Sequence, residues 1–191
     1  MGKPHFPLPV NLIVGMLSRY QDLFEEAEER LQGEFGPIDL RSEVLPFDFT
    51  DYYEEEMGKD ILRKFLSFER LIDPGSIASI KLLTNTMEED FRKVKASVGR
   101  PLNLDPGYIG GSKLVLATTK DYSHRVYLGE GIHAEVTLRF TRGSFEPMPW
   151  TYPDYRTENY LSFFSQVRSS YLEKLKRQPI GAVMENRSRG N

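Results

Sequence analysis

Residues 103–140 read NLDPGYIGGSKLVLATTKDYSHRVYLGEGIHAEVTLRF, and they contain the clearest strand pattern of the chain. Over residues 132–141 apolar and polar side chains alternate, as they do in a strand with one buried face. Residues 124–128 precede this segment across a Gly-Glu-Gly turn, so the two segments predict a β-hairpin. Upstream, residues 102–108 predict another strand, and residues 113–119 predict a short helix that follows Gly110-Gly111-Ser112.

The rest of the chain supplies the partners of this hairpin. Residues 10–17 are an apolar run that predicts a buried strand, and residues 42–49 and 61–71 predict two more. Apolar side chains at helical spacing predict helices after Ser18, after Ser76 and after Thr157. The order of the first six elements is that of a ferredoxin-like unit. The predicted fold is therefore α+β, with a ferredoxin-like βαββαβ core, an extended antiparallel sheet and an additional C-terminal helix. Helices on one face would leave the other face partly open for a ligand.

Length and composition restrict the protein class. A chain of 191 residues suits one domain, predicted over residues 1–177, and the polar residues 178–191 predict a disordered tail. The net charge of −3 makes nucleic acid an unfavoured partner, although a local basic patch stays open. The absence of cysteine excludes disulfides, thiolate metal ligands and cysteine nucleophiles. No apolar run is long enough for a membrane span and no signal peptide is recognisable, so a cytoplasmic protein is expected.

Several long strings resemble a known family: NLIVGMLS (11–18), FDFTDYYEEEMG (47–58), NLDPGY (103–108), KLVLATTKDYSHRVYLGEGIHAEVTL (113–138) and PWTYPDYRT (149–157). On these strings, residues 8–175 are similar to a prokaryotic family of unknown function, DUF4416. The resemblance implies no established activity. Some members carry a GTP-binding label, but Gly110-Gly111-Ser112-Lys113 departs from the G-x-x-x-x-G-K-[ST] pattern that would justify it.

The glycine pair suggests a first ligand-binding segment. Glycines before a helix let backbone N–H groups approach an anion, and a lysine adds positive charge. The predicted ligand-binding residues here are Tyr108, Gly110, Gly111, Ser112 and Lys113. The alternative is a plain strand-to-helix turn in which Ser112 caps the helix.

The residues at the start of the predicted hairpin suggest a second ligand-binding segment. Lys120 and Arg125 could bind a phosphate or carboxylate, and His124 between them could act as a general acid or base. Alternation would put His124 and Arg125 on opposite faces, so a solvated hairpin entrance is the alternative. Further along, His133 and Glu135 share a predicted strand face with Thr137 and Arg139 and are candidate catalytic residues. Charges that pair across strands are the alternative there.

Carboxylates suggest a divalent cation, with Mg²⁺ as the candidate. Asp48, Asp51 and Asp105 are the predicted ligands, because aromatic or glycine-rich neighbours limit their exposure. The run Glu54-Glu55-Glu56 is better explained as a solvated acidic turn. The loop MPWTYPDYR (148–156) could stack on a base or sugar, or it could pack the last helix on the sheet.

These candidates lead to one spatial hypothesis, in which residues 47–56 and 103–140 form two walls of one site. The expected function is binding or processing of a small phosphate-bearing or other anionic ligand, nucleotide-like, with a divalent cation. The alternative is a non-catalytic module that binds RNA or protein through an open sheet face and the aromatic loop. A third reading is that the polar rows stabilise strands and that the real interface is an oligomer contact.

Overall fold

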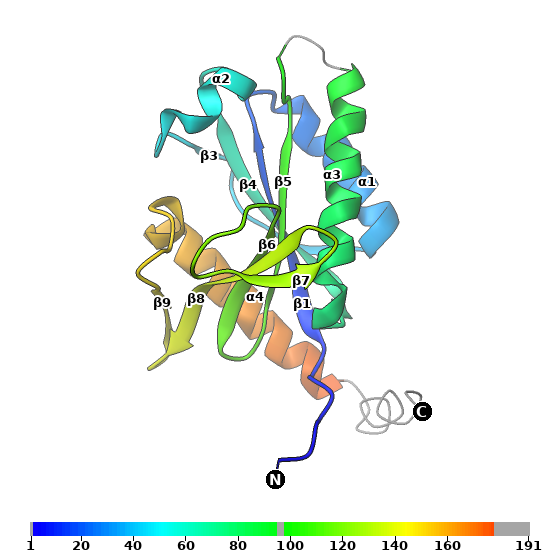
Figure 1. Ribbon diagram of the computed structural model, residues 1–191, viewed down its shortest axis with the longest axis vertical. Helices are drawn as coiled ribbons and strands as arrows, with labels where there is room; N and C mark the ends of the chain where they lie inside the picture. Colours follow the sequence, from blue (N-terminus) through cyan, green and yellow to red (C-terminus); the bar gives the residue numbers. More distant parts are fainter. Residues whose placement is uncertain (1, 95–97, 178–191) are drawn as a thin grey trace.

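The computed structural model describes residues 2–94 and 98–177, so the predicted tail over 178–191 lies outside the described residues. Within these ranges nine strands form one antiparallel sheet with four α-helices around it (Figure 1). The strands are β1 Val10–Ser18, β2 Ile38–Arg41, β3 Leu45–Pro46, β4 Leu62–Ile72, β5 Asn103–Ile109, β6 Lys113–Thr118, β7 Val126–Gly129, β8 Ile132–Thr141 and β9 Ser144–Pro147. The helices are α1 Asp22–Phe35, α2 Glu54–Met57, α3 Ile77–Val94 and α4 Glu158–Arg177, with 3₁₀ turns at η1 Asp51–Tyr53, η2 Pro74–Ser76 and η3 Asp154–Arg156. None of the helices in the described ranges is long and apolar enough to cross a membrane.

The strands follow the order β2-β4-β1-β5-β6-β8-β7, with β3 added to β4 and β9 added to β8. The central strand β1 is buried along its whole length, as its apolar run predicts. Strand β4, the hairpin of β7 and β8, and helices α1, α3 and α4 also lie close to where the sequence predicts them. The mixed fold with an antiparallel sheet and a C-terminal helix is confirmed.

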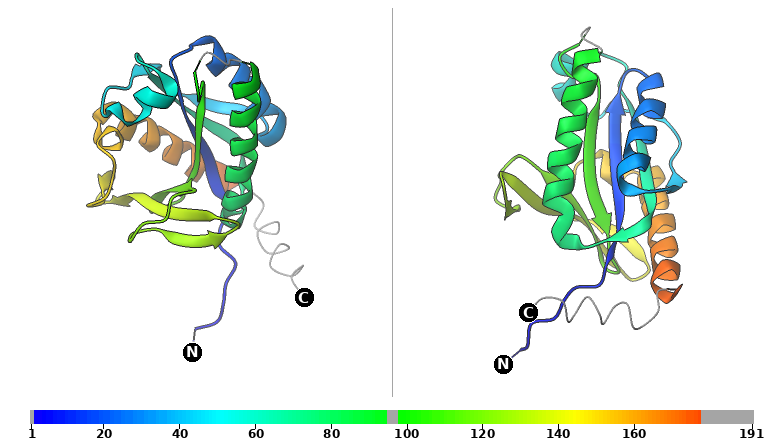
Figure 2. Two further views of the ribbon diagram at one scale, coloured as in Figure 1. Left: turned by 45° about the horizontal axis from the view of Figure 1, so that its top comes forward. Right: turned by 90° about the vertical axis from the view of Figure 1, so that its right-hand side faces the viewer.

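Both faces of the central strands are covered, so the expected open face does not exist there. Leu12 and Val14 of β1 pack in a core with α1 and α3, whereas Ile13 packs in a second core with Phe163 and Phe164 of α4. Figure 2 shows α4 across the sheet from α1 and α3. The burial of both sets of alternating β1 side chains is what requires helices on both sides.

Two element predictions are wrong. Residues 113–119, predicted as a helix, form strand β6, because both edges of this short segment find strand partners, β5 on one side and β8 on the other. The strand predicted over residues 42–49 is replaced by β2, which ends at Arg41, and by the two-residue β3. Pro46 lacks the N–H group that a longer β3 would use in the ladder.

Strands β5 and β6 diverge part-way along their length. They pair only through Gly107–Ile109 of β5, while Asn103–Gly107 and the rest of β5 pair with β1 on the other side. A side chain at Gly107 would be 2.4 Å from the carbonyl oxygen of Val115, so glycine permits the close approach where the strands separate. We call this divergence, between residues 103–106 of β5 and 116–118 of β6, the fork.

Candidate functional site

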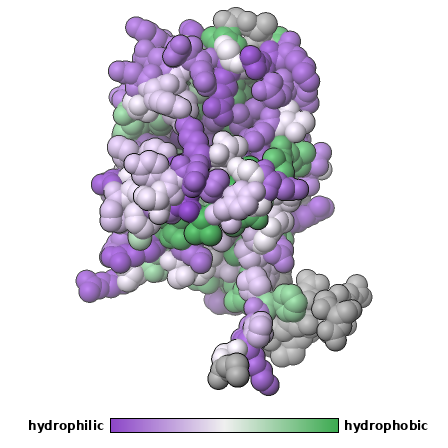
Figure 3. Space-filling model, viewed as in Figure 1, coloured by the Kyte–Doolittle hydropathy of each residue, from purple (hydrophilic) through white to green (hydrophobic). Residues whose placement is uncertain are grey.

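A cavity of about 520 Å³ opens at the fork. Asn103 and Asp105 of β5 line one side, and residues 116–120 line another. Phe47, Phe49 and other residues of the segment before α2 close it from a third direction. The two stretches predicted to form the walls of one site therefore do meet at a single cavity. Figure 3 shows a band of hydrophilic residues between the α2 region at the upper left and the β7–β8 layer below it.

Charged side chains dominate the polar lining. The cationic ones are Arg63, Lys81, Arg100, Lys120 and Arg125, and the anionic ones are Asp105, Glu135 and Asp154. They come from six separate parts of the chain, namely β4, α3, the approach to β5, β5 itself, the β6–β8 region and η3. The fork thus gathers charges that the sequence keeps far apart.

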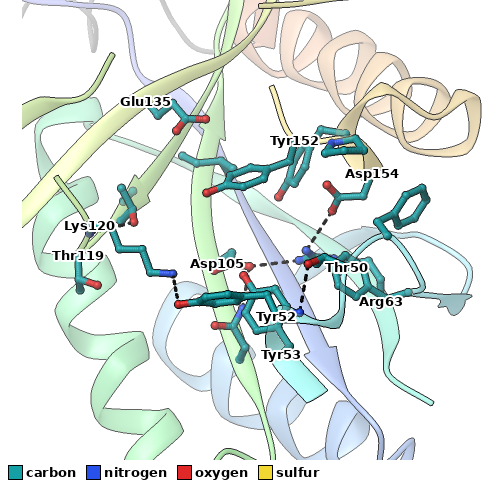
Figure 4. Close-up of a pocket in the computed structure, with 18 of the residues that line it drawn as sticks. Thr50, Tyr52, Tyr53, Arg63, Asp105, Thr119, Lys120, Glu135, Tyr152 and Asp154 are labelled. Carbon is teal, nitrogen blue, oxygen red and sulfur yellow. Dashed lines mark hydrogen bonds and ion pairs between the residues drawn. The ribbon is translucent and has the colours of Figure 1, made fainter. Parts of the chain in front are cut away.

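Arg63 is the centre of the cavity floor. Its guanidinium is buried and bridges two carboxylates, with 3.2 Å from Nη1 to Asp105 Oδ2 and 3.2 Å from Nη2 to Asp154 Oδ2. Gly15 of β1 lies between β4 and β5, and a side chain there would be 3.0 Å from Arg63 Nη1. The missing side chain at Gly15 is what lets an arginine of β4 reach a carboxylate of β5. Figure 4 shows Arg63 linked to both Asp105 and Asp154.

The two carboxylates on Arg63 differ in protonation behaviour. Burial would raise the pKa of Asp105, but Lys81, Arg63 and Arg100 surround it and lower the pKa below its ordinary value. For Asp154, burial prevails and raises the pKa, with Arg63 opposing it. Burial also raises the pKa of the Tyr155 hydroxyl well above 10, so that group is neutral. The floor therefore holds one firmly ionised carboxylate, Asp105, beside a permanent cation.

A second ion-pair group braces β5 from α3. Arg100 donates to Glu88 Oε2 at 2.7 Å and to the side chain of Asn103, and the Asn103 amide donates to Asp105 Oδ2 at 2.7 Å. Lys81 donates to the carbonyl of Leu104 at 2.6 Å, and the Leu104 N–H donates to Glu88 Oε1. These contacts satisfy the backbone groups that the fork deprives of a strand partner.

Glu135 is the hub of the opposite wall. Its buried carboxylate accepts from Arg125 Nε at 2.9 Å and from Thr137 Oγ1 at 3.2 Å, and it lies 3.0 Å from His124 Nε2. The imidazole of His124 stacks on the ring of Trp150, with 5.0 Å between ring centres. His124 therefore lies behind Glu135, and Glu135 itself lines the cavity.

Two tyrosines flank the cavity at its rim. Lys120 donates to the Tyr52 hydroxyl at 2.9 Å, and its Nζ also lies 4.4 Å from the centre of that ring. Arg125 donates to the Tyr152 hydroxyl at 3.0 Å. In Figure 4 the rings of Tyr152 and Tyr52 lie above and below Asp105. The side chains of both tyrosines are substantially exposed, and both line the cavity.

The glycine segment is not part of this cavity. Gly110–Lys113 forms the tight turn at the other end of the β5–β6 hairpin, closed by a 2.9 Å bond from the Gly110 N–H to the Lys113 carbonyl. Strand β6 follows in place of the expected helix, so no helix N-terminus faces an anion there. Tyr108 packs against the core beside α1 and α3 and does not line the cavity. The ligand-binding residues predicted in this segment therefore lie away from the site.

Some of the other predicted residues line the cavity and some do not. Lys120, Arg125, Glu135 and Asp105 line the cavity, whereas Asp48 and Asp51 are exposed and do not. Within residues 2–94 and 98–177, no three or more His, Asp or Glu side chains form a group that could hold a metal ion. The predicted carboxylate trio thus does not converge.

The predicted row of strand β8 is also divided. His133 turns to Asp121 at 3.5 Å, and Arg139 pairs with Glu146 of β9 at 2.8 Å. Glu135 lines the cavity, and the buried Thr137 donates to it from outside the lining. A register shift between β6 and β8 interrupts the alternation near Thr137. Cross-strand pairing, the alternative for this face, explains Arg139.

The residues at the floor of the cavity were not predicted from the sequence. Arg63, Arg100, Asn103 and Asp154 were not candidates, and their local sequence contains no motif. Strand β4 also contains Lys64, Ser67, Glu69 and Arg70, so its sequence gives no signal that Arg63 is the charged side chain that is buried and paired.

Comparisons with known proteins place the chain in a family. The model of a domain of unknown function, DUF4416, matches residues 8–171. No curated protein and no solved structure matches the chain. The match spans all nine strands and most of α4, including every residue of the cavity. The chain belongs to the DUF4416 family.

Proposed function

We propose that the fork cavity binds a small anionic ligand, and that a phosphate-bearing, nucleotide-like molecule fits it best. The observation that carries this proposal is the charge of the lining. Five cationic side chains face three anionic ones, although the whole chain has a net charge of −3. A local excess of positive charge in a concave site raises the concentration of anions there.

Lys120 is the best candidate for the contact with the anion. Arg63, Lys81, Arg100 and Arg125 each pair with an Asp or Glu side chain. Among the described residues, Lys120 is the one cationic lining residue that forms no such ion pair. An ammonium group that contacts only a phenol gains more from a phosphate than a cation already neutralised by a carboxylate.

The size and aromatic rim of the cavity favour a ligand with a ring. A volume of about 520 Å³ lies in the range of small-molecule sites. Tyr52 is 64% exposed and Tyr152 is 49% exposed, and both line the opening. Exposed ring faces of this kind stack on a base or a sugar.

The alternative, an RNA- or protein-binding module, has weaker support. Of the aromatic residues in the loop over 148–156, Tyr155 is buried in the core of α4, and Trp150 stacks on His124 while donating to the Val136 carbonyl. Only Tyr152 presents an exposed ring from this loop. The sheet face that such a module would use is covered by α4.

Three finer features are also proposals. We propose that β1, α1, β2, β4, α3 and β5 form a ferredoxin-like unit, which the order β2-β4-β1-β5 supports. A prokaryotic origin and a cytoplasmic location are proposed with it.

A ligand panel tests the function. Inorganic phosphate, ribose 5-phosphate and ATP at millimolar concentration, each with and without Mg²⁺, should raise the melting temperature of the purified chain if one of them binds. Lys120→Gln should abolish most of that rise. Lys113→Gln, at the far end of the same hairpin, should preserve it. A flat response of the unmodified chain to the whole panel would contradict the proposal.

A further inference from the structure

We propose that Asp105 is a specificity-determining residue that binds a hydroxyl group of the ligand, so that the ligand is a sugar phosphate or a nucleotide rather than a bare anion. This inference rests on the proposed function. It concerns the floor of the cavity, where a carboxylate faces a site that otherwise attracts anions.

The two carboxylate oxygens of Asp105 do not share its hydrogen bonds equally. Both of its protein donors, Arg63 Nη1 at 3.2 Å and Asn103 Nδ2 at 2.7 Å, bind the same oxygen, Oδ2. Among the described residues no donor binds Oδ1. The carboxylate lines the cavity and its side chain is 27% exposed. An ionised oxygen that faces a cavity without a donor is a site for an O–H or N–H group of a ligand.

The surroundings hold this carboxylate in place. Asp105 lies on β5 directly opposite Gly15 of β1, and Arg63 reaches it across that glycine. Asn103, the other donor, is itself fixed by Arg100. A carboxylate with one oxygen anchored by two donors keeps its second oxygen in one direction, which is what selective recognition requires.

Lys120 and Asp105 therefore favour different groups of a ligand. Lys120 at the rim offers an unneutralised cation, and Asp105 at the floor offers an unbonded anionic oxygen. A bare phosphate dianion satisfies only the first and is repelled by the second. A phosphate ester of a sugar satisfies both, with its ring between Tyr52 and Tyr152.

Asp105→Asn is the decisive variant, because the neighbours fix the orientation of the new amide. Arg63 and Asn103 both donate to the inner position, so the amide oxygen must occupy it. The NH₂ group then points into the cavity where Oδ1 was. The substitution thus replaces an acceptor with a donor while it preserves shape.

Calorimetric titrations of the purified chain give the readout. Asp105→Asn should weaken ribose 5-phosphate by about tenfold or more, the value of one hydrogen bond to a charged group. Inorganic phosphate, which has no sugar hydroxyl, should bind the variant as well as or better than it binds the unmodified chain. Asp39→Asn is a matched control, since it weakens a partly buried ion pair to Lys174 and neither residue lines the cavity, and it should retain the preference of the unmodified chain.

The outcomes separate the two proposals. If no phosphate compound binds the unmodified chain, the proposed function fails. If phosphate compounds bind but Asp105→Asn weakens ribose 5-phosphate and inorganic phosphate equally, or neither, the assignment of Asp105 is wrong. A measurement on the unmodified chain covers the case in which the variant does not fold. Ribose 5-phosphate should then bind at least about tenfold more tightly than methyl phosphate, and equal affinities would overturn the inference.

Discussion

The β5–β6 hairpin has two ends that differ in what surrounds them. At the tip, Gly110–Lys113, the strands are closed by a short turn and the side chains of Ser112 and Lys113 point to solvent. At the fork, the same two strands separate, and the cavity between them is lined by charged side chains from α3, β4 and η3. The sequence predicted a ligand-binding loop at the tip, whereas the structure has its cavity and its buried charges at the fork.

The two ends of the hairpin differ in what they cost in free energy of folding. Burying a guanidinium and its partners is costly unless each charge is paired, and a packed apolar core would be at least as stable. A tight exposed turn carries no such cost. Charges that are buried at the fork without a need for stability support the proposal that the fork binds a ligand. Substitutions at the fork should therefore have larger effects than matched substitutions at the tip.

The largest effect is expected from Arg63→Met. The substitution keeps the aliphatic stem but leaves Asp154 buried without a cation and removes one donor from Asp105. Breaking a buried ion pair from one side costs about 3–5 kcal/mol of unfolding free energy. Urea unfolding followed by circular dichroism measures this loss.

The matched change at the tip is Arg168→Met. Arg168 of α4 donates to the Gly111 carbonyl and lies over the Phe140 ring, but it is solvent-accessible. Its loss should cost about 1 kcal/mol. Equal losses for the two arginines would mean that the floor is not the buried network described above.

The second effect is steric and uses two glycines of the same hairpin. In Gly107→Ala the new methyl group would lie 2.4 Å from a backbone oxygen, so the strands must shift at the fork and about 2–3 kcal/mol should be lost. In Gly111→Ala the methyl group meets nothing within 4 Å, and the change should stay within about 0.5 kcal/mol. A thermal melt of both variants distinguishes them. A stable Gly107→Ala chain with unchanged ligand response would show that the fork tolerates closure.

The secondary structure was predictable from the sequence in some segments and not in others. An apolar run predicted β1, and the sharp stop at residues 73–75 marked the end of β4. Periodicity predicted β8 and the three long helices, because each has an apolar stripe that is buried. It failed at β6, where residues 113–118 are too few to show a period and where pairing with two neighbouring strands decides the conformation. Local preference is a weak guide in a segment whose partners are distant in sequence.

Only those residues of the site that lie close together in the sequence could be predicted to meet in space. Lys120, Arg125 and Glu135 lie close together along the chain, so their proximity in space could be expected from a hairpin. Arg63, Asp105 and Asp154 meet only because β4, β5 and η3 converge across Gly15. No local pattern encodes that contact, and the glycine that permits it is a single residue inside an apolar strand.

The smallest effect concerns pH. The folded-state pKa of Asp105 lies below its ordinary value near 4, because three surrounding cations outweigh the effect of burial. An acid with a lowered folded pKa adds stability above its unfolded pKa, and that stability is lost as the pH falls through the folded value. The difference in unfolding free energy between the unmodified chain and Asp105→Asn, about 1 kcal/mol, should therefore be constant from neutral pH to about pH 5 and shrink below about pH 4. Asp154 and Glu88, whose pKa values burial raises, are present in both proteins and largely cancel in the difference.

Urea unfolding at a series of pH values from 7 to 3 measures this difference. Lys113→Gln at the tip should give a difference that stays flat over the same range, since no carboxylate among the described residues pairs with that lysine. A difference that grows on acidification would mean that the charge of Asp105 opposes folding. In that case the cations of the fork would not suffice to hold an ionised carboxylate at the floor, and the free oxygen that faces the cavity would lose its anionic character where a ligand is expected to bind.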